Sequence, residues 1–146
     1  MQFSITGCIP YPFLYLACFS ATMQVILDTN VLMLPGTLGF DVFAETERLS
    51  GPATFCVIDK SIDELNKLAL HSKKGKDKNA ARLALQLIEK KGIIIIPTSG
   101  SSYADEHLLN MEGYAIATID KALLAALKQR GRQAITLRQK KYMVFY

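Results

Sequence analysis

The chain has 146 residues, the usual size of one domain; half of them are apolar and 21% are charged. This balance is typical of a chain with one buried core. It excludes a disordered chain, a collagen-like repeat and a large multidomain enzyme. The three cysteines (Cys8, Cys18 and Cys56) include no CxxC pair. We therefore expect reduced thiols, and neither a disulfide scaffold nor a zinc site.

Charge is distributed unevenly along the sequence. All 17 lysines and arginines lie at or after Arg48, a region with nine acidic residues, so its net charge is +8. The first 47 residues contain four acidic residues and no basic ones, which gives a net charge of −4. A basic region attracts polyanions such as nucleic acids, although many soluble proteins are modestly basic.

Residues 1–22 are largely apolar and uncharged. They lack the basic n-region of a signal peptide, and Pro10 and Pro12 interrupt any helix there. We interpret residues 1–22 as an apolar N-terminal extension, dispensable or produced by the choice of start codon, with a membrane anchor as the alternative. Residues 23–146 are expected to form one domain in the cytoplasm, and no membrane partner is expected.

Strand and helix patterns alternate from Met23 onward. In chain order, the patterns predict a strand at Val25–Asp28, a helix at Gly39–Leu49, a strand at Ala53–Val57, a helix at Ser61–Leu70, a basic loop at Lys73–Lys78, a helix at Asp77–Lys91, a strand at Ile93–Ile96 buried on both faces, a helix at Tyr103–Asn110, a strand at Ala115–Thr118, a helix at Lys121–Arg130 and a strand at Ala134–Leu137. This alternation predicts an α/β domain with a parallel sheet covered by helices on both faces.

Four acidic residues lie where such a sheet binds ligands, beyond the carboxyl ends of its strands. Asp28 and Asp120 directly follow strands, while Glu64 and Asp105 lie near the starts of helices. Carboxylates held close together repel one another unless a cation lies among them. Oxygen ligands without Cys or His favour Mg²⁺ or Mn²⁺, and such an ion beside a basic surface is suited to phosphodiester hydrolysis.

Each acid also has a purely structural interpretation. The segments Ser61–Glu64 and Ser102–Asp105 resemble capping boxes, in which the acid closes the start of a helix. Asp120 is suited to cap the helix that follows it, and Asp28 to form an Asx turn with Asn30. The joint placement of the four acids at one end of one sheet favours a functional role.

Four short motifs resemble, in order, those of PIN-domain nucleases. They are Leu27-Asp28-Thr29-Asn30, Asp63-Glu64-Leu65, Tyr103-Ala104-Asp105-Glu106 and Ala117-Thr118-Ile119-Asp120. The resemblance runs from about Met23 to Lys141. The last two motifs, together with the strand Ile135-Thr-Leu-Arg138 and the basic residues after it, are most similar to the archaeal-type branch of endonucleases that process small-subunit rRNA. Toxins of the VapC type share the four acids.

The resemblance implies a PIN-like three-layer sandwich, with a parallel sheet of four or five strands in the order 3-2-1-4-5 flanked by helices. It implies an endoribonuclease that depends on Mg²⁺ or Mn²⁺, with Asp28, Glu64, Asp105 and Asp120 as catalytic residues. Of these, Asp28, Asp105 and Asp120 would bind the metal ion. Asn30 and Thr118 would be supporting residues. Glu106 stands where the rRNA-processing branch often has a second Asp, and its longer side chain would change the metal geometry.

Basic residues in two places are expected to contact RNA. These are Lys73, Lys74, Lys76 and Lys78 in the basic loop, and Arg138, Lys140 and Lys141 in the tail. Aromatic residues are interleaved in the tail, and they either stack on single-stranded RNA or pack on the sheet edge. The expected substrate is RNA, either single-stranded RNA or precursor rRNA. A homodimer, ribosome-assembly proteins and an antitoxin are further candidate partners. A VapC-type toxin and an RNA-binding assembly scaffold that does not cleave are the alternative functions.

Overall fold

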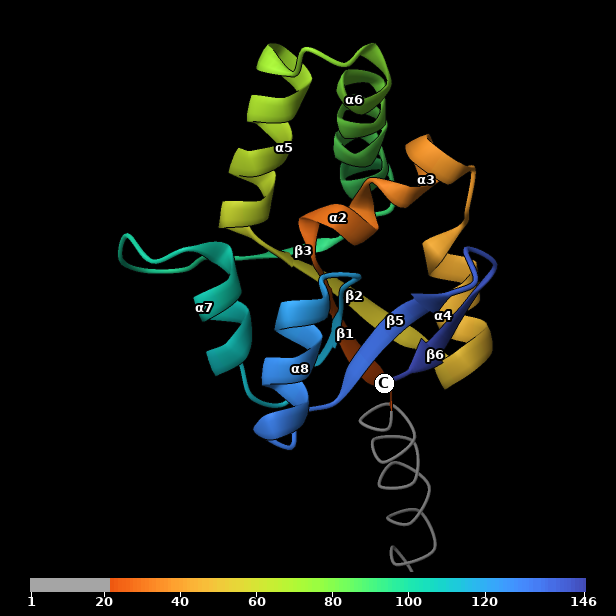
Figure 1. Cartoon of the computed structure of the whole chain (residues 1–146), viewed down its shortest axis with the longest axis vertical. Coiled ribbons are helices and arrows are strands. Elements are labelled where there is room, and N and C mark those ends of the chain that lie inside the picture. Colours follow the sequence, from red (N-terminus) through yellow and green to blue (C-terminus); the bar gives the residue numbers. More distant parts are fainter. Residues whose placement is uncertain (1–21) are drawn as a thin grey trace, which may run out of the picture.

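The structure is a computed structural model that describes residues 22–146. The expected N-terminal extension therefore lies outside the described residues, except for Thr22. The centre of the domain is a six-stranded sheet in the order β3-β2-β1-β4-β5-β6 (Figure 1). The strands are β1 (Met23–Leu27), β2 (Ala53–Ile58), β3 (Ile94–Ile96), β4 (Ala115–Ala117), β5 (Ala134–Arg138) and β6 (Tyr142–Phe145). The first five are parallel, which confirms the order 3-2-1-4-5, and β6 adds an antiparallel strand beyond β5.

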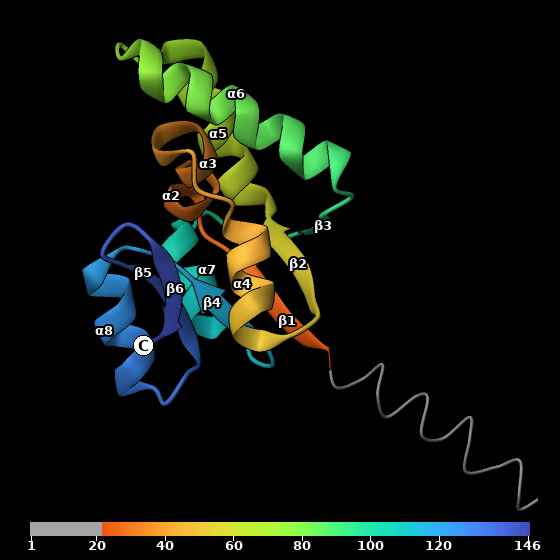
Figure 2. The same ribbon diagram turned by 90° about the vertical axis from the view of Figure 1, so that its right-hand side faces the viewer.

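Helices cover both faces of the sheet and give the expected three layers. They are α2 (Thr29–Leu32), α3 (Leu34–Leu38), α4 (Val42–Ser50), α5 (Asp59–His71), α6 (Gly75–Lys90), α7 (Ala104–Asn110) and α8 (Lys121–Gln129). Helices α7 and α8 lie on one face, while α4 covers the other (Figure 1). Helices α5 and α6 pack against each other and extend beyond the carboxyl ends of the strands (Figures 1 and 2). None of the helices in residues 22–146 is long and apolar enough to cross a membrane.

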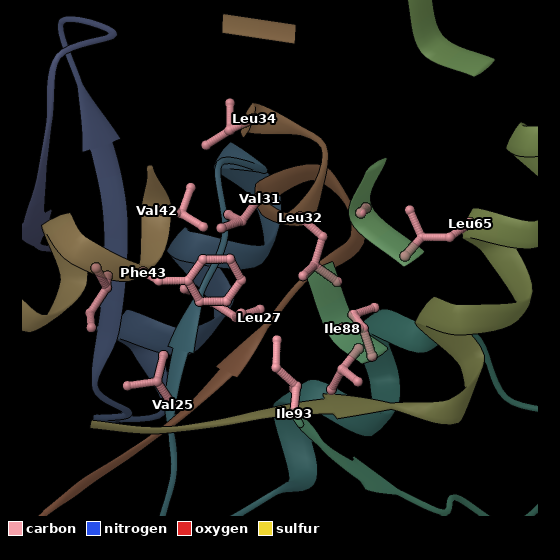
Figure 3. Close-up of a cluster of buried hydrophobic side chains, with 14 of the residues drawn as sticks. Val25, Leu27, Val31, Leu32, Leu34, Val42, Phe43, Leu65, Ile88 and Ile93 are labelled. Atoms are coloured by element: carbon pink, nitrogen blue, oxygen red, sulfur yellow. The ribbon is translucent and has the colours of Figure 1, made fainter. Parts of the chain in front are cut away.

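The central strand β1 is buried on both faces because its side chains alternate between two cores. Val25 and Leu27 belong to the larger core beneath α4, which also contains Leu65 and Ile88 (Figure 3). Ile26 points the other way, into the smaller core under α7 and α8. This double burial fixes the position of the residues that follow β1.

The edge strand β3 differs from the prediction. Ile94 and Ile95 are each 51% exposed, so the expectation of burial on both faces was wrong. An isoleucine run is typical of a central parallel strand, but β3 pairs with β2 alone and, in the described part of the chain, no strand lies beyond it. Of this isoleucine run, only Ile93, which precedes β3, and Ile96, its last residue, contact the cores.

Two further differences concern chain reversals. The basic loop is shorter than expected because α6 begins at Gly75, so Lys76 and Lys78 lie in the first turn of a helix. Strand β6 was not predicted as a strand. The turn before it places Gln139 and Lys140 at positive φ (54° and 57°), a conformation that glycine or asparagine usually adopts.

Candidate functional site

A cleft of about 550 Å³ lies at the carboxyl ends of β1 and β4. Strand β1 pairs with β2 on one side and with β4 on the other. The strand order reverses between β1 and β4, and this switch point is where sheets of this kind bind ligands. The cleft runs along α5 as far as the first turn of α6. Its lining contains all four predicted acids and Asn30, and comprises Asp28, Thr29, Asn30, Met33, Leu34, Thr37, Glu64, Leu68, Asp77, Asp105, Ile119 and Asp120.

Asp28 lies at the floor of this cleft and is only 5% exposed. One carboxylate oxygen, Oδ1, accepts a hydrogen bond from the backbone N–H of Thr29 at 2.8 Å. The other, Oδ2, accepts from the hydroxyl of Thr118 at 2.7 Å. Thr118 Oγ1 in turn accepts from the N–H of Asp120 at 3.1 Å. Thr118 is fully buried, so it links the two acids through a fixed bridge.

Burial and neighbouring carboxylates raise the pKa values of Asp28, Glu64 and Asp105. Burial raises the pKa of Asp28 to about 6, the negative charges of Asp105 and Glu64 add to the increase, and the hydrogen bonds from Thr118 and Thr29 oppose it. Desolvation against the cleft wall raises the pKa of Glu64, and Asp105 adds to that effect. The pKa of Asp105 is raised by desolvation and then by the charge of Asp120. The cleft therefore disfavours the negative charge of these three carboxylates.

One buried hydroxyl in the cleft has no hydrogen-bond partner among residues 22–146. Thr29 is 7% exposed, it lines the cleft, and its Oγ1 makes no hydrogen bond to the described protein atoms. It lies close enough to the Glu64 carboxylate to lower the pKa of that group. Buried polar atoms without a well-formed hydrogen bond are rare, and the group that this hydroxyl interacts with is the Glu64 carboxylate.

The helix starts test the two capping-box interpretations. Helix α5 begins at Asp59, so Ser61 lies inside the helix and Glu64 is too far along it to close a capping box. Helix α7 has Tyr103 as its N-cap and no side-chain cap bond, so the second capping box is also wrong. Neither the Glu64 carboxylate nor the Asp105 carboxylate caps a helix.

The other two acids do have local structural roles. Asp120 caps α8, since its Oδ1 accepts from the N–H groups of Ala122 at 2.8 Å and Leu123 at 3.3 Å, as predicted. Asp28 bonds to Thr29, so the expected Asx turn with Asn30 was wrong. The Oδ1 atom of Asn30 accepts from the N–H of Ile119 at 3.4 Å instead.

The structure places the remaining candidate residues around this cleft. Glu106 is exposed on α7 and is not part of the cleft lining. Lys73 and Lys74 lie in the turn between α5 and α6, while Lys76 and Lys78 flank Asp77 at the outer end of the cleft. Arg138, Lys140 and Lys141 are exposed at the β5–β6 turn. This turn follows the carboxyl end of β5, so it lies at the same end of the sheet as the cleft.

Asp77 and Thr29 are among the cleft residues that were not predicted from the sequence. Asp77 looked like part of a solvated basic run, and it reaches the cleft only because α6 packs against α5 and α3. Thr29 lies within one of the four motifs, but its burial depends on the start of α2. Within residues 22–146, no three His, Cys, Asp or Glu side chains are arranged closely enough to hold a metal ion as they stand.

Comparison with known proteins gives consistent relatives. A family model described as a PIN like domain matches residues 25–140. Ribonuclease VapC4 of Methanocaldococcus jannaschii is 32% identical over 131 residues, which cover 84% of this chain and 96% of the relative. Ribonuclease VapC9 of Archaeoglobus fulgidus is 34% identical over 106 residues, covering 73% of this chain and 76% of the relative.

Solved structures show the same fold. The PIN domain endonuclease Utp24 superposes with a TM-score of 0.70 at 22% identity, over 86% of this chain and 92% of that structure. A domain of a functionally unknown protein from Methanocaldococcus jannaschii gives a TM-score of 0.50 at 18% identity, over 80% of this chain and 92% of that structure. The family match spans most of the chain and the fold agrees with it. The chain therefore belongs to the PIN-like domain family of nucleases.

Proposed function

We propose that the protein is an endoribonuclease that hydrolyses RNA phosphodiester bonds with the help of Mg²⁺ or Mn²⁺. The observation that carries this proposal is the gathering of Asp28, Glu64, Asp105 and Asp120, from four separate parts of the chain, in one cleft. The two relatives at 32% and 34% identity are named ribonucleases, which supports RNA as the substrate.

The chemistry of the cleft fits a divalent cation. Its donors are carboxylate, amide and hydroxyl oxygens, which Mg²⁺ and Mn²⁺ prefer. Burial first, and neighbouring carboxylates second, raise the pKa values of Asp28, Glu64 and Asp105, and a bound cation would favour their charged forms. We assign the ion to Asp28, Asp105 and Asp120. A divalent ion supplies positive charge for the phosphate and makes water more acidic.

The protein groups have separate tasks in this mechanism. Thr118 and the Thr29 N–H hold the Asp28 carboxylate in one orientation. Glu64 is exposed and does not cap a helix. Its raised pKa suits it to accept a proton from the attacking water. The new P–O bond to this water oxygen replaces the bond to the leaving ribose oxygen, which takes a proton from solvent. Asn30 fixes the backbone of Ile119, directly before Asp120.

The biological role we propose is the processing of precursor rRNA, on the strength of the motifs around Asp105 and Asp120. A VapC-type toxin is the second candidate, because both sequence relatives carry that name. In that case the expected partner is an antitoxin. Deleting the gene separates the two roles: rRNA precursors should accumulate if the protein is a processing enzyme. Growth arrest on expression of the protein alone, without rRNA precursors after deletion, would support the toxin.

The activity is tested with purified protein and a labelled single-stranded RNA. Cleavage should require Mg²⁺ or Mn²⁺ and stop in excess chelator. Glu64→Gln should lower the cleavage rate by roughly 100-fold or more, the loss expected when a general base is removed. Asp63→Asn changes the preceding exposed acid, which is not in the cleft lining, and should leave the rate unchanged. Full activity in chelator would refute the metal mechanism, and binding without cleavage would support the RNA-binding scaffold.

The lysines at the outer end of the cleft are expected to contact the RNA backbone. Changing Lys73, Lys74, Lys76 and Lys78 to Gln should weaken binding to all sequences alike. The slope of log affinity against log salt should flatten by about 0.7 for each lost phosphate contact on a single strand. Lys90→Gln, at the other end of α6, is the control and should leave the slope unchanged. An unchanged slope in the quadruple variant would show that these lysines are only solvated.

A further inference from the structure

A second groove lies between α8 and the β5–β6 hairpin. Residues paired across two antiparallel strands share a face, and the register pairs Thr136 with Val144 and Arg138 with Tyr142. The N–H of Tyr146 continues this ladder by donating to the Ala134 carbonyl at 3.0 Å. The groove measures about 310 Å³ and is lined by Ile119, Lys121, Leu124, Thr136, Leu137, Arg138 and Tyr146.

This groove is continuous with the acidic cleft. Ile119 lines both, and it stands between Thr118 and Asp120, the two residues linked to the Asp28 carboxylate. Its side chain is 37% exposed, so it forms a low ridge between the two hollows. An RNA strand whose scissile phosphate lies at the acids would therefore place an adjacent nucleotide in the groove.

The lining of the groove has the opposite charge from the cleft. Lys121 and Arg138 are exposed, and among the ion pairs of residues 22–146 neither has a carboxylate partner. Tyr146 is 51% exposed, and Lys128 Nζ lies 5.4 Å from the centre of its ring. Free cations beside an exposed aromatic ring are the elements that bind phosphates and stack a base in single-stranded nucleic acids.

We propose that this groove binds a nucleotide of single-stranded RNA next to the bond that is cut. In this proposal Lys121 and Arg138 contact the phosphates on either side of that nucleotide, and the Tyr146 ring stacks on its base. The proposal rests on the proposed ribonuclease function and adds a subsite to it. A protein partner fits less well, because protein interfaces are depleted in lysine, and both Lys121 and Lys128 lie at this groove. The groove is small, and a stacked base must be unpaired, so single strands are favoured over duplexes.

The binding test uses a short fluorescent single-stranded oligoribonucleotide in excess chelator, so that affinity is measured without cleavage. Tyr146→Leu should weaken binding by roughly 5- to 150-fold, the range for the loss of one aromatic–base stack. Tyr146→Phe keeps the ring and should bind within about twofold of the parent. Phe145→Leu is the matched control: Phe145, the last residue of β6, is 42% exposed, directly precedes Tyr146 and is paired with Ile135 on the other face of the hairpin.

A second measurement locates the nucleotide. Single abasic riboses are placed along the oligonucleotide, and one position should weaken binding to the parent but not to Tyr146→Leu, because the stack is already lost there. Lys121→Gln and Arg138→Gln should each flatten the salt slope by about 0.7. Parental affinity in all three variants would overturn the subsite even if the protein cleaves RNA. Weakened binding of these variants in a protein that never cleaves would overturn the proposed function, while the groove would remain a binding site for single-stranded RNA.

Discussion

Replacing Asp28 by Asn should abolish RNA cleavage and at the same time stabilise the folded protein at neutral pH. The carboxylate is 5% exposed, and its surroundings raise its pKa to about 6 from an ordinary value of 3.8. Asn keeps nearly the same shape, and its Oδ1 can still accept from the Thr29 N–H. It lacks the charge that a cation would bind, so cleavage with Mn²⁺ should fall by orders of magnitude while the fold survives.

The effect on stability depends on pH in a defined direction. Because the folded state binds the Asp28 proton more tightly than the unfolded state, the parent loses stability as pH rises from about 4 to about 6. Each pKa unit corresponds to about 1.4 kcal/mol, so the penalty is on the order of 3 kcal/mol above pH 6. Asp28→Asn removes this penalty and should be more stable than the parent at pH 7.5, with the difference shrinking at pH 4.

Denaturant unfolding at the two pH values, in chelator, measures this difference. The control is Asp41→Asn, which makes the same chemical change at the exposed N-cap of α4, where Asn caps as well as Asp. It should leave the stability at pH 7.5 close to that of the parent. An Asp28→Asn variant that cleaves RNA at the parental rate would refute the assignment of Asp28 to the metal. If Asp28→Asn and the parent were equally stable at both pH 4 and pH 7.5, the buried charge of Asp28 would not destabilise the fold as we expect.

Gly36→Ala should strongly destabilise the protein. A Cβ added at Gly36 in α3 would lie 2.5 Å from Ala80 Cα and 2.7 Å from Ala80 Cβ in α6. The nearer atom belongs to the backbone, so one of the two helices must move. The overpacking should lower the free energy of unfolding by about 1–3 kcal/mol, even though Ala favours helices more than Gly does. RNA cleavage should also fall, because Leu34 and Thr37 of α3 line the acidic cleft.

Thermal and denaturant unfolding of two glycine variants separates this steric clash from helix propensity. At Gly75, the first residue of α6, an added Cβ meets no atom within 4 Å. Gly75→Ala should therefore be neutral or stabilising by up to about 1 kcal/mol. Adding Ala80→Gly to Gly36→Ala should not restore full stability, since the new methyl group would still collide with the backbone of α6. A Gly36→Ala variant as stable as the parent would show that α3 and α6 can separate without cost.

The sequence predicted the layers and the acids because those signals are local. Apolar runs locate the five parallel strands, and the rule that ligands bind beyond strand ends is enough to single out Asp28 and Asp120. The exposure of Ile94 and Ile95 was not predictable, because the isoleucine run does not say which strand lies at the edge. Strand β6 was missed because Gln139 and Lys140 give no turn signal.

The helix starts and the full cleft depend on contacts between distant residues. Asp59 Oδ2 accepts from the N–H of Thr98, 39 residues later, and this bond fixes the first turn of α5 two residues earlier than predicted. That shift removes Ser61 from the capping position. Asp77 reaches the cleft through the packing of α6 on α5 and α3. Neither contact has a signature in the neighbouring sequence.

The pairing of β1 with β4 also determines when the acidic cleft can form during synthesis. Asp28 follows the first strand of the sheet to be made, yet its hydrogen-bond partner Thr118 lies 90 residues later. Until β4 is available, β1 has a partner on one side only, and contacts between residues so far apart in sequence form slowly. A nascent chain that has not yet reached Asp120 therefore carries the first three acids without the fourth. Under the proposed function, we therefore expect a ribosome-bound chain that ends before Asp120 to be inactive toward RNA.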